Sequence, residues 1–525
     1  MTDLEMHPTR WGDPARATAL PDAARGLVEL AFPTDDRSVA EGAAVRLPAI
    51  GLGADVLDAF AEVLGAEQVL TDDESRRLRT RGKSTPDLLR ARAGDLTDAP
   101  DAVVRPGDAG QVQAVLEVAG RHRVAVVPFG GGTSVTGGLV ARREGYAGVV
   151  SLDLMRMKRL LATDRVSMTA TLEPGLRGPE AEALLAERGL TLGHFPQSFE
   201  FASIGGFAAT RSSGQSSAGY GRFDALVTGL TVATPTGPIE LGHAPASAAG
   251  PDLRQLFLGS EGAFGVITSV TVRVRPLPEA HLNEGWRWAS FDTGVEALRV
   301  LAQAQLLPTV LRLSDESETA LNLADPDAIG GGAAGGCLMI TGYEGTSEAV
   351  DARRTAVSAL LTDVGGTPAG EEPGRAWAAG RFDAPYLRDS MLDVGVLVET
   401  LETATFWSHL REVYDAVSAA LHAALGEPVM VLCHVSHVYE TGASLYFTVA
   451  ASQGDDPLGK WLGAKRAAMD AIVASGATIT HHHAVGTDHL PWLESEIGPV
   501  GVSILRAVKA SLDPQGILNP GVLVG

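Results

Sequence analysis

The chain has 525 residues, enough for two or more domains, and its 45% apolar and 20% charged residues are ordinary for a soluble globular protein. Its formal net charge of −22 argues against a nucleic-acid groove or an anionic membrane surface as partner, although a local basic pocket for a phosphate stays compatible with it. The two cysteines, Cys337 and Cys433, give no disulfide framework and favour a reducing compartment.

We find no targeting or membrane-spanning pattern. The N-terminus carries Asp3 and Glu5 instead of a basic and then apolar segment, and no run of 18 apolar residues occurs. The sequence ends in Leu523-Val524-Gly525, which is no peroxisomal S-K-L signal. We therefore expect a cytoplasmic protein without a transmembrane segment.

The first 95 residues predict a helical lead-in. Residues 9–14 suggest an extended arm, and apolar residues recur at helical spacing from Leu57 to Leu64. Residues 81–84 form a polar break before Pro86, a residue that suits the first turn of a helix.

From Pro100 the pattern changes to alternating strands and helices. Residues 102–104 predict a strand, and the turn at residues 106–108 can cap a helix with an apolar face. Strands are also expected at residues 124–127 and 149–154.

A glycine-rich turn follows the strand at residues 124–127. It consists of Pro128, Phe129, Gly130, Gly131, Gly132, Thr133 and Ser134. Three glycines remove every Cβ, so backbone N–H groups can approach a ligand and form an anion nest for a phosphate or pyrophosphate. The spacing fits neither a P-loop nor a Rossmann fingerprint. The alternative interpretation is a glycine-rich surface loop.

Two further stretches combine small and hydroxyl residues. The first contains Gln197, Ser198, Phe199, Glu200, Phe201, Ala202, Ser203, Thr210, Arg211, Ser212 and Ser213. The second contains Glu261, Gly262, Ala263, Phe264, Gly265, Val266 and Ile267, and an alternating strand at residues 271–275 follows it. Such backbones can lie along a flat ligand and donate hydrogen bonds to it. For the first stretch, the alternative is a tightly packed helix start.

The second half predicts further strands and helices. Strands are expected at residues 308–313, 337–342, 430–434 and 444–450, and helices at 350–361, 407–425 and 504–511. Residues 330–336 predict a loop. Three polar places stand out here: Arg388, the G-A-x-x-Y motif that ends at Tyr446, and the triple histidine His481, His482 and His483.

The glycine turn and the two small-residue stretches, in this order, resemble the FAD domain of the vanillyl-alcohol oxidase / p-cresol methylhydroxylase superfamily. The triple histidine and the tyrosine motif narrow this to the alkyldihydroxyacetonephosphate synthase family, and the resemblance extends from Trp11 to Pro520. It implies FAD, bound non-covalently at the loop because Thr133 stands where covalently linked relatives have His. In that family the flavin N5 adds to C1 of acyl-dihydroxyacetone phosphate, the fatty acid leaves, and a fatty alcohol replaces it without net redox.

The same resemblance implies the catalytic roles. Arg388 would bind the substrate phosphate through its guanidinium, with an ion pair to Asp389 or a glutamate as the structural alternative. Tyr446 would exchange the C1 proton. A free phenol titrates near pH 10, so it needs a neighbouring imidazole, which His481, His482 or His483 could supply. If their segment is an extended strand, His481 and His483 share one face. The alternative for Tyr446 is a half-buried strand tyrosine.

A metal is not expected. The D-2-hydroxy-acid dehydrogenases, a related branch, hold a divalent ion, and the matching positions here are His434, Tyr446 and His482. Two of these three ligands are replaced, and the acidic ligand is missing.

We predict an α+β flavoprotein with three segments: a lead-in (1–95), a two-subdomain FAD-binding domain of the PCMH type (96–278), and a cap with an antiparallel sheet (279–525) whose C-terminal segment contacts FAD. The predicted function is that of an alkyldihydroxyacetonephosphate synthase acting on a lipid-like or phosphorylated small molecule. The alternative is an FAD-dependent oxidoreductase of a hydroxy acid or alcohol. Ala484 and Ser436-His437 depart from the family pattern, so the substrate stays open. A homodimer is expected from the family alone.

Overall fold

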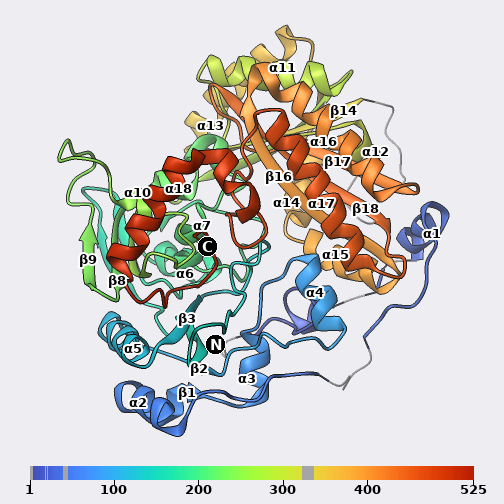
Figure 1. Ribbon diagram of the computed structural model, residues 1–525. Coiled ribbons are helices and arrows are strands. Elements are labelled where there is room, and N and C mark those ends of the chain that lie inside the picture. Colours follow the sequence, from blue (N-terminus) through green and yellow to red (C-terminus); the bar gives the residue numbers. More distant parts are fainter. Residues whose placement is uncertain (1–3, 18, 21, 40–44, 322–335, 525) are drawn as a thin grey trace.

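The computed structural model describes residues 4–17, 19–20, 22–39, 45–321 and 336–524 and has an α+β architecture (Figure 1). Figure 1 shows a part with smaller sheets, coloured blue to green, beside a part built on one large sheet, coloured yellow to orange. Of the loop predicted at 330–336, residues 330–335 lie outside the described residues.

A four-stranded sheet carries the glycine turn. Its order is β1 (Val69–Leu70), β2 (Ala102–Val104), β4 (Gly148–Asp153) and β3 (Val124–Phe129), and β2, β4 and β3 run parallel. The helix α5 (Ala109–His122) packs on it because Asp108 caps its start and its apolar face is buried. The other helices here are η1 (Pro14–Arg16), α1 (Asp22–Ala31), α2 (Ala54–Leu64), η2 (Ala66–Gln68), α3 (Asp73–Leu78) and α4 (Thr85–Arg92).

A five-stranded antiparallel sheet follows. Its order is β5 (Leu160–Asp164), β6 (Thr169–Leu172), β10 (Val266–Arg273), β8 (Val227–Thr234) and β9 (Gly237–Leu241). The pair β7 (Leu190–Thr191) and β11 (Arg275–Pro276) lies apart from it, so the strand predicted at 271–275 is divided in two. The helices are α6 (Gly178–Ala186), α7 (Ile204–Thr210), α8 (Ser217–Tyr220), α9 (Phe223–Leu226) and α10 (Arg254–Phe257).

The large sheet has seven antiparallel strands. Their order is β15 (Thr367–Gly370), β12 (Ala280–Trp288), β14 (Cys337–Gly345), β13 (Val310–Ser314), β17 (Val429–Val435), β18 (Gly442–Ser452) and β16 (Val396–Phe406). Its helices are α11 (Phe291–Gln303), α12 (Glu316–Leu321), α13 (Ser347–Asp363), α14 (Glu372–Gly380), α15 (Ala384–Asp393), η4 (Trp407–His409), α16 (Leu410–Leu425) and α17 (Pro457–Ala474). One contiguous apolar core joins this sheet to the five-stranded sheet.

The C-terminal segment returns to the first part of the molecule. After η5 (Leu490–Trp492) and α18 (Leu493–Leu512), Leu518 pairs with Val126 of β3, and Lys509 Nζ donates to the Ala263 carbonyl at 2.8 Å. Figure 1 shows α18 in red lying against the green part. The end of the chain thereby braces the strand that leads into the glycine turn.

Three local predictions were wrong. Residues 9–14 form turns that end in η1, because Gly12 adopts a positive φ of 72°. The last helix was predicted from residue 504 but begins at Leu493 and kinks at Gly498, whose φ is 72°. The three histidines lie in successive bends, so they do not form a strand.

Candidate active site

A cavity of about 530 Å³ lies where the two parts of the molecule meet. Every cofactor segment predicted from the sequence contributes to its wall, together with α1, α15 and the strands β16, β17 and β18. Tyr446, His482, His483 and Arg388 also line it, whereas His481 does not. The structure therefore brings together candidate residues that are more than 300 positions apart in the sequence.

The glycine turn is packed too closely for side chains. A Cβ on Gly131 would lie 1.9 Å from the Phe201 carbonyl oxygen, and one on Gly130 would lie 2.3 Å from Ser203 Oγ. Gly132 has a φ of 70°, which favours glycine. Ser203 caps α7, so both interpretations of the small-residue stretch hold: it starts a helix and it lines the cavity.

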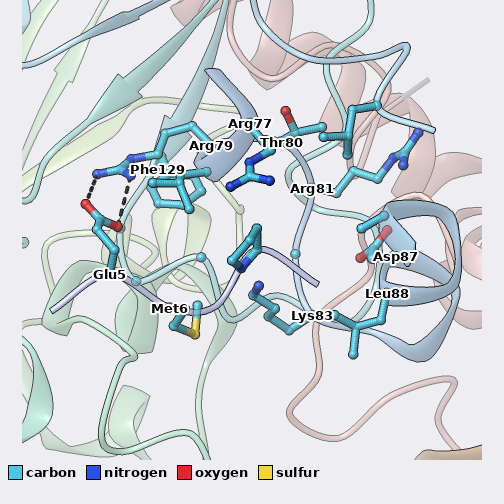
Figure 2. A pocket seen from close by; sticks show the side chains of 18 of the residues that line it. Glu5, Met6, Arg77, Arg79, Thr80, Arg81, Lys83, Asp87, Leu88 and Phe129 are labelled. Atoms are coloured by element: carbon cyan, nitrogen blue, oxygen red, sulfur yellow. Dashed lines mark hydrogen bonds and ion pairs between the residues drawn. The ribbon is translucent and has the colours of Figure 1, made fainter. Parts of the chain in front are cut away.

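A smaller cavity flanks the other side of the glycine turn (Figure 2). Figure 2 shows Lys83 near Met6 of the N-terminal arm, while Arg79 is held by Glu5. The Lys83 backbone N–H donates to the Ser134 carbonyl at 2.7 Å, and its ammonium donates to the His7 carbonyl at 2.6 Å. Burial lowers the pKa of Lys83 to about 8. A buried cation therefore stands beside the glycine turn.

The residues present fit a large polar ligand such as FAD. Gln197 Nε2 and Gln215 Oε1 are buried and have no hydrogen-bond partner among the described protein atoms, although both residues line the cavity. Orphaned polar atoms of this kind are costly unless a ligand satisfies them. The glycine turn adds the close backbone approach that a diphosphate requires.

The cavity wall beside the glycine turn is braced by Glu261, whose neighbour Gly262 packs against Pro128. Its carboxylate accepts the backbone N–H groups of Val485 and Gly486, at 3.2 and 2.7 Å, and Asn519 Nδ2 donates to its backbone carbonyl at 2.7 Å. Burial raises the pKa of Glu261 to about 7. The C-terminal segment is thus tied to a predicted cofactor segment.

Replacing Gly131 by Val should lower FAD occupancy. The new Cβ would collide with the Phe201 carbonyl and displace the turn from its neighbour, so the nest would lose its geometry. The measurement is the ratio of flavin to protein absorbance after purification and after reconstitution with FAD. Gly463→Ala, on the exposed face of α17 where a Cβ meets nothing within 4 Å, is the control and should keep full occupancy. Equal FAD content in both variants would contradict the role of the turn.

Tyr446 lies in the centre of a row across three strands. On β18 it pairs in register with Glu402 of β16 and with His434 of β17, so the three side chains share one face of the sheet. The His434 ring stacks on Tyr446 with centroids 4.8 Å apart, and the His483 ring stands edge-on at 5.7 Å. Burial raises the pKa of Tyr446 to about 12, so the phenol is protonated at neutral pH.

Glu402 holds the triple-histidine segment. Its carboxylate accepts the backbone N–H groups of His481, His482 and His483, at 2.7, 3.1 and 3.0 Å, and the Thr480 hydroxyl at 2.6 Å. Burial alone would raise the pKa of this carboxyl, but the adjacent imidazoles in their charged form, and then the Thr480 hydroxyl, lower it well below its usual range. The segment curls around one anion, which is why the predicted extended strand does not form.

The imidazoles are neutral at pH 7. Burial lowers the pKa of His483 to about 3 and that of His437 well below its usual value. The hydroxyls of Ser213 and Ser217 lie 3.0 and 2.7 Å from His437 Nδ1, so the predicted cofactor stretch that ends at Ser213 contacts the histidine cluster directly. Neutral imidazoles can accept a proton, and the Glu402 carboxylate, 3.9 Å from His483 Nδ1, favours their charged form.

Arg388 lies in α15 at the edge of the cavity. Its Nη1 donates to the Lys83 carbonyl at 2.7 Å, and its Nη2 lies 3.0 Å from Asp389 Oδ1, so the ion pair considered as the structural alternative is formed. Asp389 also accepts the Trp11 backbone N–H, which ties the N-terminal arm to this helix. Binding of a phosphate by Arg388 stays a prediction.

Two groups that sequence analysis missed also line the cavity. Arg312 lies 3.0 Å from Glu318, and both contact His434 behind Tyr446. Arg381 follows α14 and faces the cavity. Arg312 could have been found from the sequence, because it is a charged residue among the apolar residues of the strand at 310–314. No sequence pattern marks Arg381 as a cavity residue.

A cluster of histidines differs from the metal set considered above. One ring nitrogen from each of His437, His481 and His482 lies within 4.8 Å of the other two. Serine hydroxyls already contact His437 Nδ1, and the Tyr439 hydroxyl lies 2.5 Å from His481 Nε2. We therefore still predict that turnover survives exhaustive chelation, measured with and without EDTA and with metal analysis of the purified protein. Stoichiometric zinc or manganese whose removal abolishes activity would contradict this prediction.

Comparisons with known proteins agree with this geometry. Residues 100–241 match the model of the FAD binding domain family, and residues 277–523 match that of FAD linked oxidases, C-terminal domain. Alkyldihydroxyacetonephosphate synthase of Dictyostelium discoideum is 33% identical over 87% of this chain and 79% of its own length. The enzyme of Trypanosoma brucei brucei is 33% identical over 92% of this chain and 83% of its own.

Comparison with solved structures indicates the same family and fold. A structure of alkyldihydroxyacetonephosphate synthase is 28% identical, covers 98% of each chain and superposes with a TM-score of 0.84. A p-cresol methylhydroxylase structure is 17% identical with a TM-score of 0.69 over 93% of this chain and 98% of its own, which shows a shared fold. The predicted α+β fold, with its PCMH-type FAD domain and antiparallel cap, and the predicted FAD cofactor are thereby confirmed.

Proposed function

Because the chain belongs to the alkyldihydroxyacetonephosphate synthase family of FAD enzymes, we propose that it forms an ether bond by exchanging the acyl group of an acyl-dihydroxyacetone phosphate for a fatty alcohol. In this exchange the bond between C1 and the acyl oxygen breaks, the fatty acid leaves, and the alcohol oxygen becomes bonded to C1. FAD supplies the nucleophilic nitrogen of its flavin ring.

The observation that best supports this proposal is the apolar end of the cavity. Leu20, Val28 and Phe32 of the N-terminal region face Met391 and Met430 of the cap in one cluster beside it. A long alkyl chain can leave water there, at about 0.8 kcal/mol for each buried CH₂ group. A small hydroxy acid would leave this surface unused.

The polar end of the cavity supplies groups for proton transfer. Tyr446 Oη carries its proton at neutral pH, and His483 is neutral. We propose that Tyr446 takes the C1 proton while its own proton passes to an imidazole, with Glu402 stabilising the resulting charge. His481, His482 and His483 act as one unit because one carboxylate orients all three.

The test is to mix the purified holoenzyme anaerobically with palmitoyl-dihydroxyacetone phosphate and hexadecanol. We expect the ether product and free palmitate by mass spectrometry, without lasting bleaching of the flavin. Persistent bleaching by a hydroxy acid or alcohol, with no ether formed, would favour the FAD-linked oxidoreductase alternative.

Other features of this proposal stay predictions. No helix among the described residues is long and apolar enough to cross a membrane. We also expect a cytoplasmic location, a role in ether-lipid synthesis, non-covalent FAD, a homodimer, and domain limits at residues 95 and 278.

A further inference from the structure

Most charged side chains that line the large cavity are already neutralised by the protein. Arg312 pairs with Glu318 and Arg388 with Asp389, while Asp383 pairs with Arg16 at 2.6 Å. The carboxylates of Glu261 and Glu399 accept backbone N–H groups. Among the described cavity residues, this leaves two cations without a carboxylate within 4 Å, Lys83 and Arg381.

These two cations lie in different places. The backbone of Lys83 is bonded to Ser134 in the glycine turn, where the cofactor diphosphate is expected. Arg381 instead lies between α14 and α15, and its backbone carbonyl accepts Gln215 Nε2 at 3.1 Å. Gln215 is two positions from Ser213, which contacts His437. Arg381 therefore stands near the reaction centre and away from the glycine turn.

The Arg381 side chain is held by aromatic rings alone. Its guanidinium carbon lies 4.8 Å from the Phe382 centroid, 5.0 Å from that of Phe195 and 5.8 Å from that of Trp377. No hydrogen bond or ion pair joins the guanidinium to another described residue, and the side chain is half-buried. Burial lowers the pKa of Arg381, and the Glu344 carboxylate, which makes no ion pair with it, offsets this lowering only in part.

Such an arrangement is costly unless a ligand completes it. Cation–π contacts offset part of the lost hydration and fix the plane of the guanidinium, but they leave its N–H donors unused. A planar fork of free donors matches the geometry of a phosphate, which it can bind through two charge-assisted hydrogen bonds. A cation needed only for stability would be expected to pair with a nearby carboxylate, yet Asp383, two positions away, pairs with Arg16.

We propose that Arg381 is a binding residue for the phosphate monoester of the substrate, in addition to the predicted Arg388. This inference rests on the proposed function, because the acyl-dihydroxyacetone phosphate provides the phosphate. It assigns a specificity role to a residue outside the sequence motifs.

The test is an isothermal calorimetric titration of the holoenzyme with dihydroxyacetone phosphate, which measures the Kd. Arg381→Met should weaken binding roughly 10- to 100-fold, the usual range for lost hydrogen bonds to a charged group. Arg381→Lys keeps the charge but loses the planar fork of donors, so its Kd should lie between those of the wild type and Arg381→Met. Arg375→Met is the matched control, since this α14 arginine is exposed and pairs with Glu371, and it should bind as the wild type does. FAD content and melting temperature identify any variant that fails to fold, and in that case the Arg381→Lys result decides.

Two further ligands separate the sources of the effect. Dihydroxyacetone, which lacks the phosphate, should bind equally to wild type and Arg381→Met, and so should palmitate. If palmitate binding falls and dihydroxyacetone phosphate binding does not, the cation serves the leaving carboxylate and the inference is overturned. If the wild type makes the ether and Arg381→Met binds dihydroxyacetone phosphate normally, only the inference fails. A wild type that binds no dihydroxyacetone phosphate would overturn both.

Discussion

Tyr446→Phe should lower kcat by about 10²–10⁴-fold, the usual contribution of a general acid–base step, while FAD occupancy and melting temperature stay close to those of the wild type. The substitution removes only the hydroxyl. The ring keeps its stacking on His434, at 4.8 Å, and its place between β16 and β17. The measurement is the single-turnover rate of ether formation with a saturated holoenzyme.

The control for this experiment is Tyr343→Phe. Tyr343 is also a buried tyrosine of the seven-stranded sheet, but its hydroxyl lies 3.3 Å from Glu284 and Thr341 and outside the cavity. It should keep the wild-type rate. A Tyr446→Phe enzyme that makes ether at the wild-type rate would refute the proton-transfer role and leave the FAD site and the fold untouched.

A second variant tests whether Tyr446 and His483 act as a unit. His483→Ala should reduce kcat like Tyr446→Phe, and the double variant should be little slower than either single one, because residues that share one step are not additive. Additive losses would mean that the two residues serve different steps.

Glu402→Gln should lower kcat by about 10²-fold with a much smaller change in KM. The carboxamide keeps one acceptor oxygen, but its NH₂ group cannot accept a hydrogen bond. In one orientation the NH₂ group would face the His481 N–H. In the other it would face the N–H groups of His482 and His483 and the Thr480 hydroxyl. The segment must shift, and a displacement of about 1 Å at a reacting group can cost 10²-fold in rate. The lost negative charge also disfavours a protonated imidazole.

Glu402→Asp distinguishes position from charge. Aspartate keeps the charge but withdraws the carboxylate by one CH₂ group. If the orientation of the histidine segment decides the rate, the Glu402→Asp enzyme should be as slow as the Glu402→Gln enzyme. Glu284→Gln is the matched control, since Glu284 is a buried carboxylate of the same sheet that is paired with Arg354, and its kcat should be unchanged. A Glu402→Gln enzyme with normal kcat would show that the histidine segment does not need this anchor.

The sequence by itself determined the local elements and the cofactor segments. Apolar periodicity and the Asp108 cap were enough for α5, and a β-branched run was enough for β3, because these signals depend on neighbours within a few residues. The glycine turn was recognisable because consecutive residues without Cβ atoms have few structural reasons to exist. The G-A-x-x-Y motif and the triple histidine pointed to the family because each is short and contiguous in the sequence.

Only the tertiary structure decided how the polar side chains are paired. Glu402 is 79 positions from His481, and their contact depends on how β16 is registered against β18 and on where the chain bends after α17. The same holds for Arg388 and Arg381: one pairs with Asp389 and one is left with aromatic neighbours, a difference that no local pattern carries. Secondary structure follows from short-range sterics and burial, but the state of a buried charge depends on which distant groups the fold brings within a few ångströms of it.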